Sequence, residues 1–169
     1  MRIFLRMVNN REVSRFLPDM FSILLQNMLV ITNEEGFDNQ ATYFQWEKYT
    51  IDSMEAGKRK TIIIIGEKRV VGFFMFSLLE HTLLIEEFEL EKDYQGKTPI
   101  FRVLPRYLAE IIPKGIKRVV AYTNINNHRA QRIMEKLKMK PRDRAGSNIC
   151  YEGNYDEIFH CFQLSGKCL

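Results

Sequence analysis

The spacing of apolar residues along the chain changes from a helical period to a strand period. Between Glu12 and Ile31, apolar side chains recur at steps of three and four residues, which predicts a helix with one apolar face. A second helix, rich in aromatic residues, is predicted over residues 40–56. From Thr61 to Ile65 every residue is β-branched, which is typical of a strand buried on both faces. The pattern therefore predicts two helices that lead into a buried sheet.

Turn residues divide the rest of the chain into further strands. Asn9-Asn10 follows a short first strand, and Gly66-Glu67-Lys68 separates two strands that predict an antiparallel hairpin. Gly153-Asn154 is interpreted as the turn of a last hairpin. Helices are predicted after residue 98 and after the Asn-rich turn near Asn127. The strands predicted in this way are residues 2–8, 61–65, 69–79, 82–91, 117–123, 147–151 and 157–164.

This order of elements predicts an α/β fold. We expect a mixed, mostly antiparallel central sheet of about seven strands with helices on both faces. The chain has 169 residues, 46% of them hydrophobic, which suits a single domain over residues 1–169 with a packed core. The net charge of +4 is mild and fits an anionic ligand without requiring one.

Cysteine usage and the amino-terminal pattern predict a cytoplasmic protein. Cys150, Cys161 and Cys168 make an odd count without metal-binding spacing, which favours a reducing compartment. Arg2 and Arg6 bracket only three apolar residues, so no signal peptide is predicted. The apolar run of residues 16–31 is interrupted by polar residues and is too short to span a bilayer, so no membrane association is expected.

The most informative stretch extends from Leu84 to Leu137. An apolar strand leads into Tyr94-Gln95-Gly96-Lys97, and a helix follows directly. A strand that feeds a loop at the start of a helix presents free backbone N–H groups, which suit a phosphate. A second strand then feeds a second amphipathic helix through the Asn-rich turn.

This stretch resembles the GNAT superfamily of N-acetyltransferases. Their motif reads approximately V-x-P-E-Y-R-G-K-G-I-G, followed by a helix, a glycine, a strand and N-x-x-A-x-x-x-Y-E-K-L-G-F. Here the order is kept without a gap from Leu90 to Met139. The matching positions are Leu90, Tyr94, Gly96, Lys97, Gly115, Asn127, Ala130, Glu135, Lys136 and Leu137.

The resemblance implies an acyl-CoA N-acyltransferase-like domain that moves an acetyl or other acyl group from acetyl-CoA, or another acyl-CoA, to a primary amine. The acceptor would be a small molecule or a peptide. In the family, pantetheine lies between two splayed parallel strands, and loop N–H groups hold the pyrophosphate. The implied cofactor-binding residues are Glu89, Leu90, Gln95, Gly96, Lys97, Thr98, Ile100 and Asn127.

Three departures from the motif support a second hypothesis. Thr98 and Ile100 stand where the family has its later glycines, and Met134 replaces a tyrosine that often acts as the general acid. A catalytically inactive GNAT-fold binding or regulatory protein is therefore the alternative function. Thr98-Pro99 also suits the start of a helix, as N-cap and first helical residue. Pro105 is expected to kink that helix or delay its start.

Carboxylates on the strand at residues 82–91 are the candidate general bases. Strict alternation places Glu86 with Phe88 on one face and Glu87 with Glu89 on the other. We expect Glu87 or Glu89 to face the helices on the acceptor side and to deprotonate an ammonium. Glu86 becomes a candidate if a β-bulge re-aims it. The alternative is that these glutamates are solvated and paired with nearby lysines.

The remaining polar residues give weaker hypotheses. Tyr122 and Tyr94 are candidate general acids by proximity alone, and no pair of histidines has metal spacing, so no metal is predicted. The basic run of residues 58–60 is expected to be a solvated helix end. No nucleic-acid-reading motif accompanies it, so nucleic acid is not an expected partner. The oligomeric state stays open, with a homodimer among the alternatives.

Overall fold

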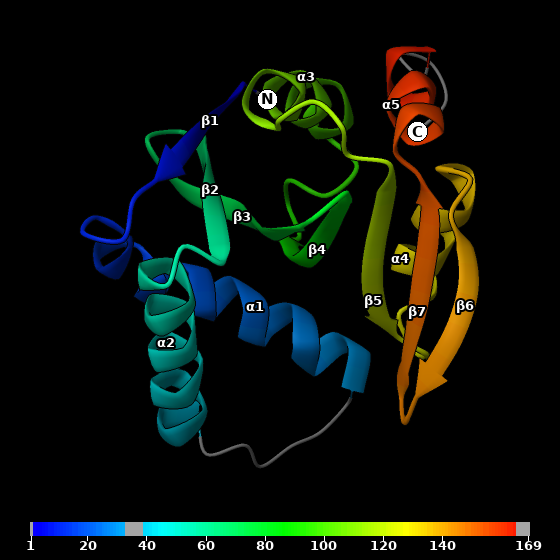
Figure 1. Cartoon of the computed structure of the whole chain (residues 1–169). Coiled ribbons are helices and arrows are strands. Elements are labelled where there is room, and N and C mark those ends of the chain that lie inside the picture. The colour runs from blue at the N-terminus through cyan, green and yellow to red at the C-terminus, as the bar shows by residue number, and fades with distance from the viewer. Residues whose placement is uncertain (1, 33–38, 165–169) are drawn as a thin grey trace. The chain divides into compact units, whose positions relative to one another are not determined.

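The computed structural model describes residues 2–32 and 39–164 (Figure 1). Its seven-stranded sheet has the order β1-β2-β3-β4-β5-β7-β6. β4 and β5 are parallel, whereas the pairs β1–β2, β2–β3, β5–β7 and β6–β7 are antiparallel. The pair β2–β3 forms the hairpin that the sequence predicted. The predicted mixed, mostly antiparallel sheet is thus confirmed. The strands are β1 (Ile3–Val8), β2 (Arg59–Gly66), β3 (Arg69–Leu79), β4 (Thr82–Leu90), β5 (Arg118–Asn124), β6 (Lys140–Ala145) and β7 (Asn148–Asn154).

Five α-helices and one 3₁₀ helix complete the described part of the chain. They are η1 (Val13–Arg15), α1 (Leu17–Thr32), α2 (Asn39–Glu55), α3 (Ile100–Ile111), α4 (His128–Lys136) and α5 (Tyr155–Leu164). The chain forms two compact units, which are described separately below. The first comprises residues 1–77 and 87–98, and the second comprises residues 78–86 and 99–169.

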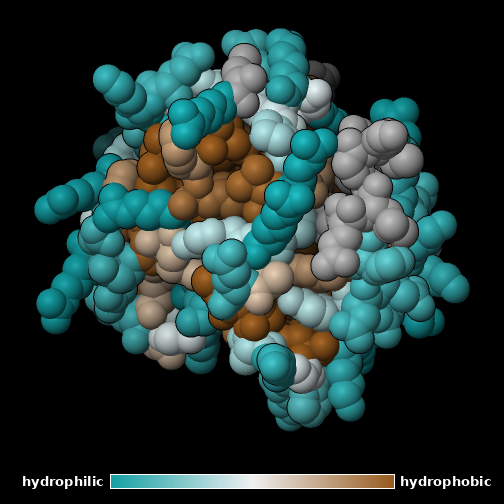
Figure 2. All heavy atoms as spheres, turned by 90° about the horizontal axis from the view of Figure 1, so that it is seen from above, coloured by the Kyte–Doolittle hydropathy of each residue, from teal (hydrophilic) through white to brown (hydrophobic). Residues whose placement is uncertain are grey.

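The core of the first unit lies between α1, α2 and the strands β2 and β3. Leu17 and Met20 of α1 pack in one buried cluster with Ile63 of β2 and Phe73 of β3. The β-branched residues of β2 fit a pleated surface that is covered on both sides, which explains why this strand has no polar face. On the face shown in Figure 2, apolar atoms reach the surface between hydrophilic side chains.

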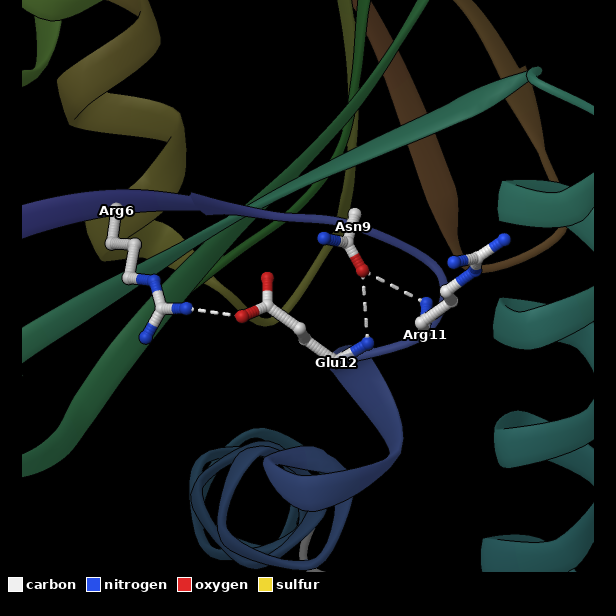
Figure 3. A network of polar contacts seen from close by, with 4 residues as sticks. All are labelled: Arg6, Asn9, Arg11 and Glu12. Atoms are coloured by element: carbon white, nitrogen blue, oxygen red, sulfur yellow. Dashed lines mark hydrogen bonds and ion pairs between the residues drawn. The ribbon is translucent and has the colours of Figure 1, made fainter.

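A polar turn joins β1 to η1 (Figure 3). The side-chain oxygen of Asn9 accepts hydrogen bonds from the backbone N–H groups of Arg11 and Glu12, each at 3.0 Å. Glu12 also pairs with Arg6 of β1. The asparagine therefore closes the turn through its side chain, as the sequence predicted for Asn9-Asn10.

Gly72 lets β4 approach β3 closely in the first unit. A Cβ atom at this position would lie 2.4 Å from the carbonyl oxygen of Glu89 and 2.7 Å from Cδ2 of Leu90. The backbone N–H of Glu91 donates to the carbonyl of Val71 at 2.9 Å. The absence of a side chain at Gly72 therefore fixes the part of β4 that carries the candidate bases.

The second unit is built around β5. β5 pairs with β7 over seven residues, from Arg118↔Asn154 to Asn124↔Asn148, and β6 continues this sheet from β7. Its parallel pairing with β4 covers the four pairs from Thr82↔Arg118 to Ile85↔Ala121. In Figure 1, α5 stands at the end of β7, beside the start of β5.

The carboxyl-terminal hairpin predicted from the sequence is wrong. Residues 155–164 form the helix α5, not a strand, and Asn154 starts it, because its side chain accepts from the N–H of Glu157 at 3.1 Å. Tyr155, Ile158 and Phe159 recur at steps of three and four residues, which is the spacing of one helix face. β6 was also missed: all its residues are exposed, so no apolar alternation marks it.

Two local predictions also need correction. α3 begins at Ile100 with Pro99 as N-cap, one residue later than the expected Thr98 cap, and Pro105 lies inside the helix without delaying its start. The prediction that the basic run at residues 58–60 is a solvated helix end is wrong for Arg59, whereas Lys58, which follows α2, is exposed. Arg59 belongs to β2, is only 5% exposed, and donates to Oγ1 of Thr50 at 2.9 Å.

We predict that Gly72→Ala lowers the free energy of unfolding by about 1–3 kcal/mol, because the new Cβ overlaps the backbone of β4. Chemical denaturation measures this change. Gly57→Ala is the comparison: its Cβ meets nothing within 4 Å, so only its positive φ of 69° opposes the substitution, at about 1 kcal/mol. Equal stability of Gly72→Ala and the wild type would show that β4 does not depend on this close approach.

Candidate functional site

The carboxylate of Glu89 is held by a side chain of α1. Nδ2 of Asn27 donates to Oε2 of Glu89 at 2.5 Å. The same amide group donates to the carbonyl of Leu90 at 3.1 Å. Asn27 therefore binds both the side chain and the backbone of β4, and it fixes the orientation of the carboxylate.

Gln95 of the loop after β4 joins this network. Its Nε2 donates to the carbonyl of Leu90 at 2.7 Å and to Oδ1 of Asn27 at 3.3 Å. The Leu90 carbonyl thus accepts from two side-chain amides, which use both of its lone pairs. The loop, the helix α1 and the end of β4 are connected through one carbonyl and one carboxylate.

Glu87 faces α2. Nε1 of Trp46 donates to the Glu87 carboxylate at 3.0 and 3.2 Å. The Trp46 ring also packs near Phe21 and Phe73, with centroid distances of 5.6 and 6.2 Å. The alternation of β4 predicted that Glu87 and Glu89 face these helices, and both hydrogen bonds agree with it.

Burial changes the acidity of Glu89. Removal of water from around the carboxylate raises its pKa from 4.5 to about 7, and the negative charge of Glu87 acts in the same direction. The hydrogen bond from Asn27 stabilises the ionised form and partly opposes this shift. A carboxylate with a pKa near neutrality can take a proton from an ammonium group at physiological pH.

The loop at residues 94–98 turns at Gly96 and leaves backbone N–H groups without acceptors among the described residues. Gly96 has a positive φ of 73°, which is accessible to glycine at little cost. Within the described chain, the N–H groups of Gly96 and Thr98 donate to no other group, whereas that of Lys97 contacts the Tyr94 carbonyl at 3.4 Å. Tyr94 anchors the loop, because its ring is 2% exposed and packs against Gly66.

The other predicted site residues lie in the second unit. Ile100 is the buried first residue of α3. Asn127 is the N-cap of α4, and its Oδ1 accepts from the N–H of Ala130 at 3.0 Å. Glu86 is half-buried on β4. The structure therefore joins Glu89, Leu90 and Gln95 in one hydrogen-bond network through Asn27, and the charge of Glu87 acts on Glu89.

A family model for the GNAT acetyltransferases matches residues 18–139. The chain belongs to the GNAT acetyltransferase family. The match includes α1, β4 and the loop that follows β4, and it agrees with the seven-stranded mixed sheet. A comparison with curated protein sequences gives no match.

Solved GNAT structures share this fold at low sequence identity. The PaiA N-acetyltransferase of Thermoplasma acidophilum, in complex with coenzyme A, is 16% identical with a TM-score of 0.71, over 92% of this chain and 100% of that chain. An acetyltransferase of Thermus thermophilus is 14% identical with a TM-score of 0.69, over 91% and 97% of the two chains. The N-acetyltransferase PseH of Campylobacter jejuni, in complex with acetyl-coenzyme A, is 9% identical with a TM-score of 0.56, over 90% and 99%.

Sequence reasoning missed Asn27 as a site residue of this GNAT protein. The signal was present, because Asn27 interrupts the apolar run of α1 one residue before Met28. A polar side chain in such a run either faces solvent or has a buried partner. Only the structure identifies the partner as a carboxylate on β4, which is distant in the sequence.

The two candidate general acids, Tyr122 and Tyr94, differ in their exposure to solvent. Tyr122 is 55% exposed on β5, and its hydrogen bond with Cys150 is the main cause that raises its pKa. The hydroxyl of Tyr94 is buried and has no hydrogen-bond partner among the described residues. In the same part of the chain, no group of His, Cys, Asp and Glu could hold a metal ion, and no helix is long and apolar enough to cross a membrane.

We predict that Glu89→Gln removes a pH-dependent loss of stability. Between pH 4.5 and about 7 the unfolded carboxyl ionises while the folded one keeps its proton, so the wild type loses stability as the pH rises. Relative to the wild type, the variant should gain up to about 3 kcal/mol of unfolding free energy from pH 4.5 to pH 8. Denaturant titrations at both pH values measure this difference, and a difference that does not change with pH would contradict the raised pKa.

Proposed function

We propose that this GNAT protein transfers an acetyl or other acyl group from an acyl-CoA to a primary amine, with Glu89 as the general base. The observation that carries the proposal is the Glu89 carboxylate, which has a pKa of about 7 and is fixed by Asn27. Membership of the GNAT acetyltransferase family supports the reaction type. The coenzyme A complex of the PaiA relative supports the acyl donor.

Proton removal is the step that this chain's residues would perform. A primary amine is protonated at neutral pH, and it becomes a nucleophile only after it loses a proton. Glu89 would accept that proton directly or through a water molecule. The nitrogen would then attack the thioester carbonyl, so that a C–N bond forms and the C–S bond breaks. The nitrogen would lose a second proton after the attack, and this proton would convert the leaving thiolate to the thiol. Glu87, which is bound to Trp46, would add negative charge that attracts the cationic acceptor.

The loop after β4 fits a phosphate-bearing donor. The free N–H groups of Gly96 and Thr98 are the kind of donor that holds a phosphate, and Lys97 adds a positive charge. In the second unit, Ile100 opens α3 without a side-chain cap, and Asn127 keeps its amide nitrogen available to a ligand. Within the first unit, we assign the acyl-CoA to backbone groups of Glu89, Leu90, Gln95, Gly96, Lys97 and Thr98. For Ile100 and Asn127, the assignment stays the prediction that the resemblance implies.

One observation favours the alternative of a catalytically inactive binding or regulatory protein. The Leu90 carbonyl already accepts from Asn27 and Gln95, so a pantetheine amide could reach it only if the Gln95 side chain turned away. Met134 in place of a tyrosine points in the same direction, because a thioether donates no proton. The acceptor class, a small-molecule or peptide amine, and a cytoplasmic location stay predictions.

We predict that acetyl-CoA raises the melting temperature of the protein in a concentration-dependent manner, because a ligand that binds only the folded state stabilises it. Gly96→Val should abolish the shift, since valine strongly disfavours the φ of +73° and its side chain approaches the phosphate. Gln95→Ala should keep or enlarge the shift, because it frees the Leu90 carbonyl. No shift of the wild type at millimolar acetyl-CoA would favour the inactive alternative.

Given acetyl-CoA binding, the pH profile tests the base. We predict that kcat/KM rises with pH through an apparent pKa near 7, and that Glu89→Gln lowers kcat by about 10²- to 10⁴-fold. Asn27→Ala should move the acid limb to higher pH, because the hydrogen bond that favours the ionised carboxylate is lost. If Glu89→Gln kept the acid limb of the pH profile unchanged, Glu89 would be excluded as the base. Glu87→Gln is the parallel variant, which tests the neighbouring carboxylate in the same way.

A further inference from the structure

A basic cavity lies in the second unit, where β5, β6, β7 and α5 meet. Its volume is about 270 Å³. Glu152 of β7 and Glu157 of α5 also line it, so the cavity has five cations against two carboxylates. The five cations are Lys117, Arg118, Lys138, Lys140 and Arg142.

Most of these cations have no side-chain partner among the described residues. Arg118 donates to Oγ1 of Thr82 at 3.1 and 3.3 Å and lies 3.9 Å from Oε1 of Glu152. The other four form no ion pair or hydrogen bond through their side chains with any described residue. Like charges around one concave surface repel one another, and a bound anion would remove that repulsion.

The sequence concentrates positive charge in this unit. Residues 78–86 and 99–169 contain 13 Lys and Arg against eight Asp and Glu. Residues 1–77 and 87–98 contain 12 against 13. The whole net positive charge of the chain therefore belongs to the unit that contains the cavity.

Two backbone features bring cations to the cavity. Lys138 has a positive φ of 64°, a conformation that glycine adopts more easily than lysine. Arg142 is the extra residue of a β-bulge, because Pro141 pairs with Tyr151 and Asp143 with the next residue, Cys150. The side chains of Lys138 and Arg142 thus reach the cavity from two positions at which the backbone departs from regular secondary structure.

The lining of the cavity restricts the ligand class. No aromatic and no large apolar side chain is among the described residues that line it. A nucleobase would need such a surface for stacking, whereas phosphate groups need only cations and N–H donors. The geometry points to a compact anion with two or more phosphate groups and no base, and we propose this cavity as its binding site.

Within the second unit, this site is separate from Asn127, one of the residues that the resemblance assigns to the acyl-CoA. Lys117 and Arg118 stand at the start of β5, whereas Asn127 follows its end at Asn124. Seven residues of strand separate the two ends, a distance of about 20 Å. The inference therefore does not depend on the proposed acetyl transfer and holds equally for an inactive GNAT protein.

Isothermal titration of the full chain with inorganic pyrophosphate, without acetyl-CoA or metal ions, tests the site. The wild type should bind, and added salt should weaken the binding. The double variant Lys140→Ser/Arg142→Ser should lose about tenfold or more in affinity. Both residues are exposed on the edge strand β6, so the variant should keep the wild-type melting temperature. Absence of binding at millimolar pyrophosphate, or full affinity in the double variant, would overturn the proposal.

Three further variants locate the binding. Lys138→Gly should weaken binding about threefold while the melting temperature stays level or rises, because glycine relieves the positive φ. Lys60→Ser, at an exposed lysine of β2, should bind as the wild type does. Lys97→Ser, in the loop after β4, should leave the affinity of the basic cavity unchanged. Loss of binding in Lys97→Ser instead would assign pyrophosphate to the acyl-CoA loop and overturn the proposal.

Two other ligands test the class. ADP should bind no more tightly than pyrophosphate, because the cavity offers no stacking surface for adenine. A tenfold gain for ADP would overturn the assignment to an anion without a base. A single-stranded oligonucleotide is the second ligand, and the opposing result is that it binds more tightly than pyrophosphate and loses this binding in the double variant. That result would assign the surface to nucleic acid and would also overturn the proposal.

Discussion

The interaction on which this structure depends most is the hydrogen bond between Asn27 and the Glu89 carboxylate. An ionisable group that is largely removed from water either stays neutral or needs a donor. Asn27 supplies the donor, and the remaining burial keeps the pKa near 7. Gly72 makes this arrangement possible, because only a residue without a side chain lets this part of β4 lie so close to β3.

The same network links the base to the loop. Gln95 contacts Asn27 and shares the Leu90 carbonyl with it, so a change in the loop alters the surroundings of Glu89. In the proposed reaction, donor binding and proton removal would therefore be coupled through one side-chain amide. In the inactive alternative, the same amide would keep the carbonyl occupied. The two functions differ in whether Gln95 moves, and the fold is common to both.

The distribution of charge separates two kinds of chemistry in one chain. The first unit has almost balanced charges, and its two carboxylates, Glu87 and Glu89, accept hydrogen bonds from Trp46 and Asn27. The second unit has the excess of cations and a cavity that they line. The net charge of +4 conceals this division. The two units have almost the same number of basic residues, 12 and 13, but the second unit has only eight acidic residues against 13 in the first.

The sequence by itself determined the order of elements up to α4, the mixed sheet and the family, because apolar periodicity and the spacing from Leu90 to Met139 are local properties of the chain. It also indicated Glu87 and Glu89 as the residues facing the helices, since alternation along a strand is fixed. It failed for α5 and β6, where a short helix resembles a strand and an exposed edge strand has no apolar pattern. Only the tertiary structure decided that Asn27 and Gln95 meet at Leu90, because contacts between residues distant in the sequence leave no local signal.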